Sequence, residues 1–536
     1  MAGFGDILCA IGDFGLFQKL LLMGLCYPSV MLAFQIYSLL FTQAGSSYHC
    51  NTDWILQDNP NLTTGEQLNL TVPRKEDGSL DKCRMFTPTD WDIDDIREHG
   101  LNETTGCING WVYDTSLFQS SIVSEFDLVC DKAFLLGVGQ TVYMAGILCG
   151  TITFGALADI FGRKRATQMP LLLLTVFVTA TAFAPNLYLY MVFQFVASMS
   201  YGGFRVNGIV LAAEWLGVTK RSLASCFSQV MGGVGQCVMA GIAYFIRRWR
   251  IAQLALASSM LPVIIYVWWI PESARWLLGH GRTEEANKLI LMAASVNKRT
   301  VPSQILDKVV TQKKGNAVTI KDLFASPILR KYFLILSFAW FSLALAYNCF
   351  NLNVGNFGLN IFLMQLIFGL TDIPGHILCI WLLEALGRKI SFASTLIFGG
   401  CISLLTLAFS EDSVIAVVAF VTTGRVFMNW AGTICNVYIQ ELFPTSFRQR
   451  AISMASIAYR VAPVLAPLVN SLVMYHRAAP TLVYGILPVV SGSLCLLLPE
   501  TRRTDLPDTT EQLEERDTKA MDVPDANDQN VISTKL

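Results

Sequence analysis

The sequence predicts an all-α membrane protein with twelve transmembrane helices arranged in two six-helix halves. Of its 536 residues, 53% are hydrophobic and only 15% are charged, whereas soluble domains carry about a quarter charged residues. The apolar residues fall into blocks of roughly 20, about the length that a helix needs to cross a ~30 Å hydrocarbon layer. Short motifs also recur at matching places in the two sets of six blocks.

The twelve predicted spans follow these apolar blocks. An even number of crossings places both chain ends on the same side of the membrane. Residues 1–16 lack the basic start of a signal peptide and run into the first block, so we expect a short cytosolic lead-in. The spans are expected at residues 17–41, 134–158, 168–184, 187–211, 224–246, 252–270, 332–350, 361–384, 391–409, 413–437, 452–474 and 481–498.

The polar segment 43–132, which follows the first span, has two features of an extracellular loop. It holds three Asn-x-Thr glycosylation acceptors, at Asn61, Asn69 and Asn102. It also holds four cysteines, which allow three disulfide pairings among which the sequence does not choose. Together they indicate a glycosylated, disulfide-bonded loop in an oxidising compartment. The four cysteines are Cys50, Cys83, Cys107 and Cys130.

Basic residues in the remaining loops set the orientation. Placing 43–132 outside puts four basic clusters and the lysine-rich segment 271–330 inside, as the positive-inside rule requires. The exception is the trio Arg247, Arg248 and Arg250, which falls outside. We therefore predict six-helix halves at 17–270 and 331–498, a cytosolic loop at 271–330, and cytosolic ends.

The last segment, 499–536, contains ten carboxylates and five basic residues. This acidic composition with few aromatic residues predicts a disordered cytosolic tail. Its final residues, Thr534-Lys535-Leu536, suit strand addition to a PDZ domain, which is a possible partner.

Three pairs of motifs indicate that the halves arose by duplication. Residues 155–165 (Gly-Ala-Leu-Ala-Asp-Ile-Phe-Gly-Arg-Lys-Arg) match 382–389, and 214–221 match 441–448. Pro-Glu-Ser-Ala-Arg at 271–275 matches Pro-Glu-Thr-Arg at 499–502. Parallel six-helix repeats suit a carrier whose halves rock about a central site.

The charged residues of these motifs have two interpretations. They can obey the positive-inside rule as ordinary loop charges, or they can form a cytosolic latch that holds the outward-open state. Small residues would let helices 2 and 11 approach closely beside it. The repeated order of acid and base favours the latch. The gate candidates are Asp159, Arg163, Glu214, Arg221, Glu272, Arg275, Glu441 and Arg448.

These motifs resemble the major facilitator superfamily. The cysteine- and glycan-bearing loop, together with Phe126-Asp-Leu-Val-Cys-Asp131 and Glu441-Leu-Phe-Pro-Thr445, resembles solute carrier family 22. Within that family the chain is most similar to the organic anion transporters, including a carrier of urate and nicotinate. The resemblance implies a major facilitator fold and alternating access at the plasma membrane, with apical sorting as one possibility.

Arg460, about nine residues into the eleventh span, is the main indicator of the cargo. Ionisable groups within spans are costly and are functional hypotheses by default, and a guanidinium matches a carboxylate. The resemblance agrees, because anion carriers of the family have arginine here whereas cation carriers have an acid. The alternative is that Arg460 pairs with an internal acid as structural support.

Two further ionisable residues bear on the cargo. Arg205 in span 4 supplies a second positive charge for substrate, or else pairs with an acid or turns toward the membrane surface. His376 in span 8 stands where the anion carriers have lysine or arginine, so a titratable group replaces a fixed charge. These residues predict an anion site whose strength depends on pH.

The other pocket candidates are aromatic or polar. Trp340 and Tyr347 share a helical face in span 7, where rings can stack on a flat anion, although such rings usually serve packing. The resemblance carries Tyr347, Asn348, His376 and Ser456 onto pocket positions. It also shows departures, since Gly232 and Gly432 replace bulky aromatics and Gln194 replaces an arginine. The remaining candidates are Phe350, Gln35, Tyr37, Gln229 and Asn436.

These observations predict a secondary active transporter, most plausibly an exchanger, of small organic anions such as urate, nicotinate or other aromatic monocarboxylates. Two alternatives stay open: a carrier of zwitterions such as carnitine, and a transport-inactive receptor or scaffold of the same fold. Since there is no Walker loop, metal-ligand spacing or catalytic triad, we expect no enzyme activity, cofactor, metal or nucleic-acid partner. The expected partners are the lipid bilayer, the substrate and a counter-anion.

Overall fold

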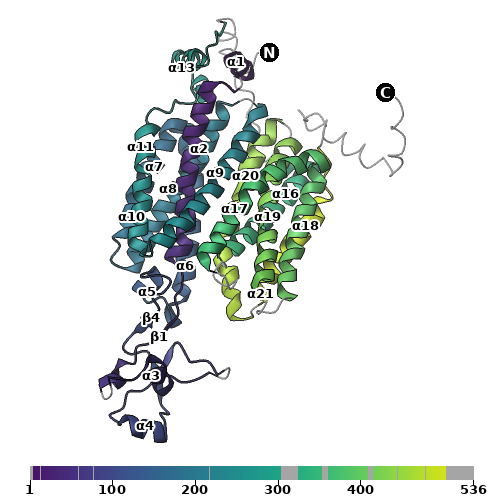
Figure 1. Ribbon diagram of the computed structural model, residues 1–536. Coiled ribbons are helices and arrows are strands. Elements are labelled where there is room, and N and C mark those ends of the chain that lie inside the picture. The colour runs from purple at the N-terminus through teal and green to yellow at the C-terminus, as the bar shows by residue number, and fades with distance from the viewer. Residues whose placement is uncertain are drawn as a thin grey trace, which may run out of the picture.

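The computed structural model describes residues 4–12, 14–57, 60–75, 78–216, 218–302, 324–352, 360–408, 414–443, 445–476 and 478–501. Within these residues the chain forms twelve helical passes side by side (Figure 1). They are α2 (Leu16–Thr42), α6 (Phe134–Phe161), α7 (Arg163–Ala182), α8 (Leu187–Glu214), α9 (Val218–Phe245), α10 with α11 (Trp249–Ser259, Leu261–Val267), α16 (Pro327–Leu352), α17 (Ile361–Leu386), α18 with η4 (Arg388–Leu405, Thr406–Ala408), α19 (Val414–Leu442), α20 with η5 (Thr445–Ser471, Leu472–Met474) and α21 (Ala479–Cys495).

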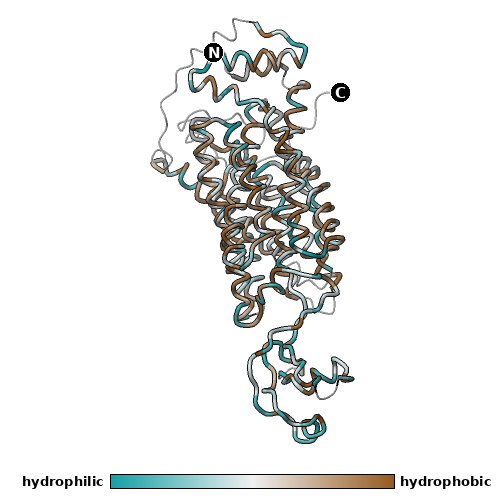
Figure 2. Tube along the Cα trace, turned by 90° about the vertical axis from the view of Figure 1, so that its left-hand side faces the viewer, coloured by the Kyte–Doolittle hydropathy of each residue, from teal (hydrophilic) through white to brown (hydrophobic). Residues whose placement is uncertain are grey.

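The bundle is a membrane domain by its composition. In the described part of the chain, seven helical segments are long and apolar enough to cross a membrane, among them Leu16–Thr42 and Val414–Leu442. Apolar residues run through the whole bundle, whereas the segment that projects from one end is mostly polar (Figure 2). We call that end the loop end. The opposite end, which carries α1 (Phe4–Ile11), is called the termini end.

Each half repeats the same packing. In the first half α2 packs on α9 and α7 packs on α8; in the second half the equivalent pairs are α16 on α20 and α18 on α19. The halves meet through two symmetry-related pairs, α9 with α17 and α6 with α20. The predicted approach of the second and eleventh spans is one of these two contacts.

Glycines allow the helices to pack closely at the first inter-half contact. A Cβ at Gly369 of α17 would lie 2.9 Å from the carbonyl oxygen of Gly233 in α9. Real Cβ atoms do not approach other atoms so closely. Close backbone approach through small residues is the usual basis of helix association in membranes.

An aromatic cluster closes the loop end between the halves. The ring of Phe362, at the start of α17, lies against three rings of the first half: Phe41 (5.5 Å between centroids), Phe118 (5.4 Å) and Tyr244 (5.8 Å). Phe118 belongs to the polar segment, so that segment takes part in the closure.

The polar segment forms a small domain held by two disulfides. Cys50 bonds to Cys107, and Cys83 bonds to Cys130, which selects one of the three possible pairings. Two short antiparallel sheets join β1 (Tyr48–Cys50) to β4 (Trp111–Tyr113) and β2 (Arg84–Phe86) to β3 (Thr104–Gly106). The domain also contains η1 (Asp53–Gln57), α3 (Thr64–Thr71), α4 (Ile93–His99), α5 (Ile122–Glu125) and η2 (Cys130–Lys132).

The three glycosylation candidates lie on the surface of this domain. Asn61, Asn69 and Asn102 are all exposed, as glycan attachment requires. Their modification stays a prediction.

The basic trio that broke the loop-charge rule anchors this domain. Arg250 donates to both the Glu125 carboxylate (2.5 Å) and the carbonyl oxygen of Ala184 (2.8 Å). Arg247 donates to the Ser116 carbonyl, and Arg248 donates to the Gln119 side chain at 2.9 Å. All three arginines therefore make hydrogen bonds to protein groups at the loop end, which explains their placement there.

At the termini end, one side chain joins three distant segments. Asn297, just after α13 (Thr283–Val296), accepts from the backbone N–H of Phe17 (2.8 Å) and donates to the Ile11 carbonyl (3.1 Å) and the Gln18 side chain (2.8 Å). It therefore caps α2 from about 280 residues away in sequence. The short α12 (Ala274–Gly279) lies just before α13.

Close packing predicts opposite outcomes for two glycines of α9. A Cβ on Gly235 would lie 2.7 Å from the Val30 carbonyl oxygen, whereas one on Gly241 would meet nothing within 4 Å. We expect Gly235→Ala to cost about 1–3 kcal/mol through overpacking, and Gly241→Ala to be neutral or stabilising because alanine favours helix. Thermal melting of the detergent-purified protein measures both, and equal stability of the two variants would contradict this packing.

Candidate functional site

A charged network joins four segments of the first half at the termini end. Arg163 begins α7 and pairs with Asp159 (2.5 Å) and Glu214 (3.2 Å). The Glu272 carboxylate accepts from the backbone N–H of Lys164 at 3.0 Å. A carboxylate is stabilised there because the first N–H groups of a helix have no internal partner.

The second half contains a similar network built from residues at equivalent positions. Arg388 begins α18 and pairs with Glu441 at 3.0 Å, while Glu500 accepts from the backbone N–H groups of Arg388 (2.9 Å) and Lys389 (3.0 Å). Gly162 and Gly387 precede the two arginines at φ 96° and 85°, a region that favours glycine. The sequence repeat therefore encodes a similar set of charged contacts in each half, and we call each set a brace. The first-half brace contains Asp159, Arg163, Glu214 and Glu272, and the second-half brace contains Arg388, Glu441 and Glu500.

The gate candidates divide between these two braces. Asp159, Arg163, Glu214 and Glu272 lie together as predicted, but Glu441 pairs with Arg388 of its own half and not with the first-half set. Arg275 is exposed on α12, and none of the ion pairs among the described residues includes it. The side chains of Arg221 and Arg448 lie outside the described residues, as do Thr534, Lys535 and Leu536.

Two arginines from opposite halves lie near each other in the middle of the bundle. Arg205 of α8 and Arg460 of α20 are close enough to interact electrostatically, and Tyr201 and Tyr459 are neighbours of both. Arg205 donates to the Tyr201 hydroxyl at 3.2 Å. The Nε atom of Arg460 is buried and has no hydrogen-bond partner among the described residues. Neither guanidinium takes part in an ion pair there.

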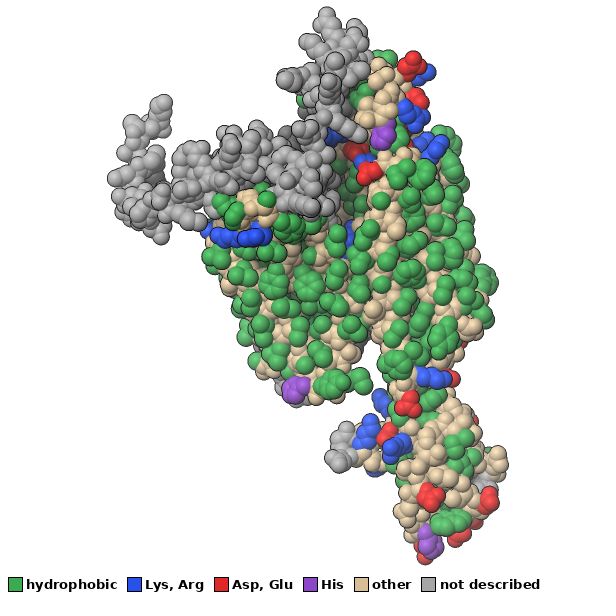
Figure 3. Space-filling model, turned by 180° about the vertical axis from the view of Figure 1, so that it is seen from behind, with side chains coloured by type: hydrophobic (Ala, Val, Ile, Leu, Met, Phe, Trp, Pro, Cys, Tyr) green, Lys and Arg blue, Asp and Glu red, His purple; other side chains and the backbone are tan. Residues whose placement is uncertain are grey.

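The surroundings of these arginines open toward the termini end. Ile209 lies one turn further along α8 and Ile457 about one turn earlier in α20; they are 45% and 44% exposed. On the opposite side of Arg205, Tyr201 is buried. From behind, a furrow separates the apolar surfaces of the two halves (Figure 3).

A third arginine in the bundle is neutralised. Arg425 of α19 is fully buried and makes a bidentate pair with Asp372 of α17, at 2.9 Å (Nη1–Oδ1) and 3.0 Å (Nη2–Oδ2). Asn429, one turn along α19, also donates to Asp372 at 3.0 Å. Paired, forked contacts of this kind compensate the cost of burying both charges.

The remaining donors of Arg425 are also occupied. Its Nε donates to Asn351 (3.0 Å), and Nη2 donates to the Tyr347 hydroxyl (3.0 Å) and to Gln236 (3.3 Å). The rings of Tyr347 and Phe368 lie 4.9 Å and 4.4 Å from the guanidinium carbon. Because Gln236 belongs to α9, Arg425 also bridges the two halves.

Several predicted pocket residues gather around the two arginines. Tyr347 of α16 and Tyr37 of α2 face each other across the halves, with hydroxyl oxygens 3.4 Å apart. Trp340 packs against Tyr459, the neighbour of Arg460, at 5.7 Å between centroids. Ser456 lies one turn before Arg460 and is half-buried.

Other candidates lie elsewhere. Phe350 packs against Tyr484 of α21 (5.1 Å), and Asn348 donates back to the Ala344 carbonyl (2.8 Å). Asn436 accepts from the Gln440 side chain at 3.3 Å, and Gln229 of α9 is exposed.

Two glutamines stand out by burial. Gln35 is buried, and its amide has no hydrogen-bond partner among the described residues. Gln194 donates to Tyr190, one turn earlier, at 2.9 Å. Since Gln194 lies eleven residues before Arg205, about 16 Å along the helix, Arg205 does not take its place.

His376 lies beside the Arg425–Asp372 pair. It is buried, its Nε2 is 3.4 Å from the Asn429 amide nitrogen, and Asp372 and Arg425 both act on it electrostatically. Its Nδ1 has no partner in the described structure. The two glycine departures differ in their surroundings, since a Cβ at Gly232 would meet nothing within 4 Å and one at Gly432 would meet Leu343 at 3.6 Å.

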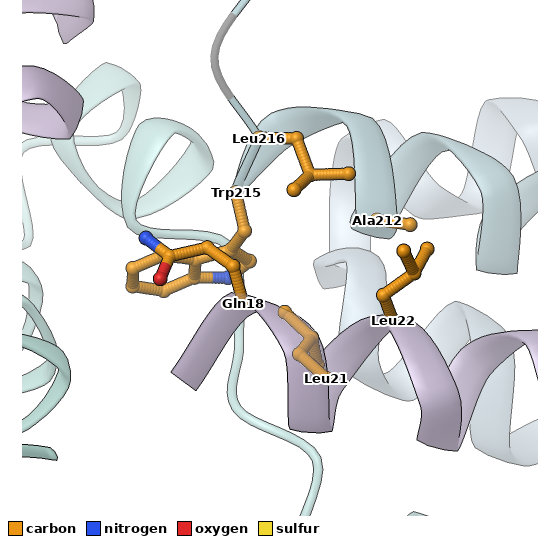
Figure 4. Close-up of a pocket in the computed structure, with 6 residues that line it drawn as sticks. All are labelled: Gln18, Leu21, Leu22, Ala212, Trp215 and Leu216. Carbon is orange, nitrogen blue, oxygen red and sulfur yellow. The ribbon is translucent and has the colours of Figure 1, made fainter. Parts of the chain in front are cut away.

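A separate small recess, too narrow to admit a water molecule, lies at the termini end between α2 and α8 (Figure 4). Gln18 is its one polar side chain, beside Trp215 and four aliphatic residues. A recess without charge offers no anion site. Among the described residues, no group of three or more His, Cys, Asp or Glu side chains is placed to hold a metal ion.

Neither Arg425 nor Asp372 was predicted from the sequence to be a functional residue. The signal was available, because Arg425 is an ionisable residue in the middle of an apolar block, which is the criterion that selected Arg460. Tyr201, Tyr459 and Gln236 carry no comparable signal in sequence.

Comparison with known proteins identifies the family. The family model described as "Sugar (and other) transporter" matches residues 97–512. The chain is 40% identical to human solute carrier family 22 member 13, over 96% of this chain and 94% of that protein. It is 34% identical to human member 14 (93% and 86% covered) and 31% identical to Xenopus laevis member 6-B (97% and 96%). The chain belongs to solute carrier family 22.

Solved structures show the fold of this solute carrier. The proton:xylose symporter XylE bound to 6-bromo-6-deoxy-D-glucose aligns with a TM-score of 0.58 at 15% identity, covering 93% of this chain and 99% of that one. The inward-open form of XylE from E. coli aligns at 0.56. The predicted major facilitator fold and family are thus confirmed. The solute carrier is a multi-pass membrane transporter, and its relatives are transporters rather than enzymes.

The buried Arg425–Asp372 ion pair predicts that loss of one partner strongly destabilises the protein and that removal of the second partner restores stability. Asp372→Asn leaves Arg425 buried without a counter-charge, which typically costs about 3–5 kcal/mol. Adding Arg425→Met should restore much of this loss. Asp159→Asn is the control, because that carboxylate is 74% exposed and its pair contributes about 1 kcal/mol or less. Fluorescence-detected size exclusion after heating measures all three, and a fully stable Asp372→Asn protein would refute the pairing.

Proposed function

We propose that this solute carrier transports small organic anions by alternating access and that Arg205 and Arg460 bind the anion between the halves. One observation carries the proposal: three arginines lie within the bundle, but only Arg425 has a carboxylate partner among the described residues. The other two are left for a ligand that brings its own negative charge.

The physical reason is the cost of bare charge away from water. Two neighbouring guanidinium groups repel each other, and an anion between them relieves both the repulsion and the missing solvation. A carboxylate also matches the fork of a guanidinium. The rings of Trp340, Tyr347 and Tyr459 nearby suit a flat aromatic body. This supports as substrates the purine anion urate and aromatic monocarboxylates such as nicotinate.

A zwitterion such as carnitine fits this arrangement less well. Its quaternary ammonium has no N–H donor and needs a free carboxylate or an aromatic face. Asp372 is already held by Arg425 and Asn429, and the rings of Tyr347 and Tyr459 already lie beside guanidinium groups. A transport-inactive receptor is favoured by Gln194 and by the glycines that replace aromatics at positions 232 and 432. We therefore retain anion transport, with exchange against an internal anion as its mode, since no nucleotide site is predicted to supply energy.

We place this carrier in the plasma membrane with the disulfide-bonded domain outside and both termini in the cytosol. Two disulfides and three exposed acceptors suit an oxidising exterior. In this orientation the two charged braces lie on the cytosolic side. Glycosylation, binding of Thr534-Lys535-Leu536 to a PDZ domain, and a latch role for the braces belong to the same proposal.

Uptake of radiolabelled nicotinate and urate into cells that express the intact chain tests the anion site. Arg460→Ala and Arg205→Ala should each lower kcat/KM by about tenfold or more, since a hydrogen bond to a charged group contributes about 1.5–3 kcal/mol. Excess carnitine should not compete. Arg97→Ala, in an exposed pair of the polar domain, is the control. Full uptake in both arginine variants, at equal surface expression, would eliminate the proposal.

His376 predicts a dependence on external pH. Protonation of His376 adds positive charge beside Asp372 and Arg425 and favours an anion, while burial of the ring opposes the charged form, so the response is expected at acidic pH. Uptake should therefore rise as external pH falls from neutral into the acidic range. His376→Lys should flatten the profile because its charge is fixed. The same pH profile in wild type and the lysine variant would contradict a role for His376.

A further inference from the structure

The hydroxyl groups of Tyr347 and Tyr37 lie in line with Arg425. Arg425 Nη2 is 3.0 Å from the Tyr347 oxygen, which in turn is 3.4 Å from the Tyr37 oxygen. Arg425 and Tyr347 belong to the second half, and Tyr37 belongs to the first. The three groups therefore form one row of hydrogen bonds that crosses from half to half.

Arg425 restricts the direction of this row but does not fix it alone, because the Tyr347 oxygen can accept from both Arg425 and Tyr37, and either hydroxyl can donate to the other. A guanidinium has five N–H donors and no acceptor, so Arg425 can only donate to Tyr347. The oxygen of Tyr347 accepts that bond, and its single hydrogen must point elsewhere. Tyr37 is the neighbour within reach. When Tyr347 donates to Tyr37, the Tyr37 oxygen becomes the acceptor and its own hydrogen is turned outward.

The groups around Tyr37 give that hydrogen no carboxylate to bind. Asp372 accepts from both terminal nitrogens of Arg425 and from Asn429. Arg205 acts electrostatically on Tyr37 but has no acceptor atom. Tyr37 and Tyr347 are both half-buried, so each retains some accessible surface.

We infer that Arg425 is a positioning residue: by donating to Tyr347 it directs a chain of hydrogen bonds that presents the Tyr37 hydroxyl as a donor to the transported anion. This inference deepens the proposed function and rests on it. The site then consists of donors only, two guanidinium groups and one directed hydroxyl. Arg425 contributes no net charge to this site because Asp372 neutralises it, yet it determines which way the hydroxyls point.

The inference assigns different consequences to small changes at Tyr37. Tyr37→Phe removes the donor and should raise KM for nicotinate about tenfold, with a change in maximal rate within about twofold. Replacing Tyr37 by 4-aminophenylalanine keeps an N–H donor and should restore most of the affinity. Replacing it by 3-fluorotyrosine makes the hydroxyl a stronger donor and should lower KM. If Tyr37 were an acceptor, the fluorinated residue would instead raise KM.

A double-mutant cycle tests the role of Arg425 itself. In the Asp372→Asn/Arg425→Met background the charges are removed together and nothing forces Tyr347 to accept. Tyr37→Phe should then cost less than about twofold in KM, against about tenfold in the native background. An equal cost in both backgrounds would overturn the positioning role. Should that background not reach the cell surface, the fluorotyrosine series still decides, because it leaves the ion pair intact.

Tyr266 provides the matched control. Its hydroxyl donates to the Gly24 carbonyl at 2.7 Å, away from the two arginines, so the same replacements there should leave KM unchanged. Wild-type uptake with a rising KM in the fluorinated Tyr37 protein would overturn this inference alone. An intact chain that takes up neither nicotinate nor urate would overturn the anion function and this inference with it.

Discussion

The middle of the bundle holds more positive than negative charge, and the rest of the structure is organised around that inequality. A single arginine at the centre of a bilayer costs about 2.5–3.5 kcal/mol on insertion scales. Asp372 removes this cost for Arg425 through a bidentate pair. Arg205 and Arg460 keep it, because their close neighbours include each other and tyrosines. An anion that binds between them supplies the missing counter-charge and so offsets the cost of burying the two guanidinium groups. This uncompensated cost is therefore available as binding energy for the substrate.

The other charges of the membrane domain are arranged in the opposite way. At the termini end the ion pairs of each brace lie within one half: Arg163 pairs with Glu214, and Arg388 pairs with Glu441. In each brace a further carboxylate accepts from backbone N–H groups in the first turn of the helix that the arginine begins. These contacts stiffen a half without tying it to the other. The halves instead meet through the Gly233–Gly369 crossing, the rings around Phe362 and the hydrogen bond from Arg425 to Gln236. None of these three contacts is an ion pair between the halves. A carrier that rocks needs this division between rigid halves and separable interfaces.

Hydropathy and repetition in the sequence were enough to predict the twelve-helix fold, because a membrane helix must be apolar along a known length. They placed helix ends less well: α9 begins at Val218 rather than 224, and α20 at Thr445 rather than 452. The sequence of those first turns is rich in polar residues, including Lys220, Arg221, Arg448 and Arg450, which lower the hydropathy there. The disulfide pairing and the anchoring role of Arg250 depend on contacts within the folded polar domain, which no local pattern contains.

The three central arginines show where prediction from sequence stops. Each is an ionisable residue within an apolar block, so sequence alone gives them the same standing, and only the position of Asp372 distinguishes Arg425 from the other two. Neutralising a charge does not remove its hydrogen-bond donors, however. Arg425 still donates to Tyr347 at 3.0 Å, and because Arg425 cannot accept, the Tyr347 hydrogen is left for another partner. The charge of Arg425 and its hydrogen bond to Tyr347 therefore involve different partners of the same side chain, so a residue that adds no net charge to the site can still influence the donors that a ligand meets.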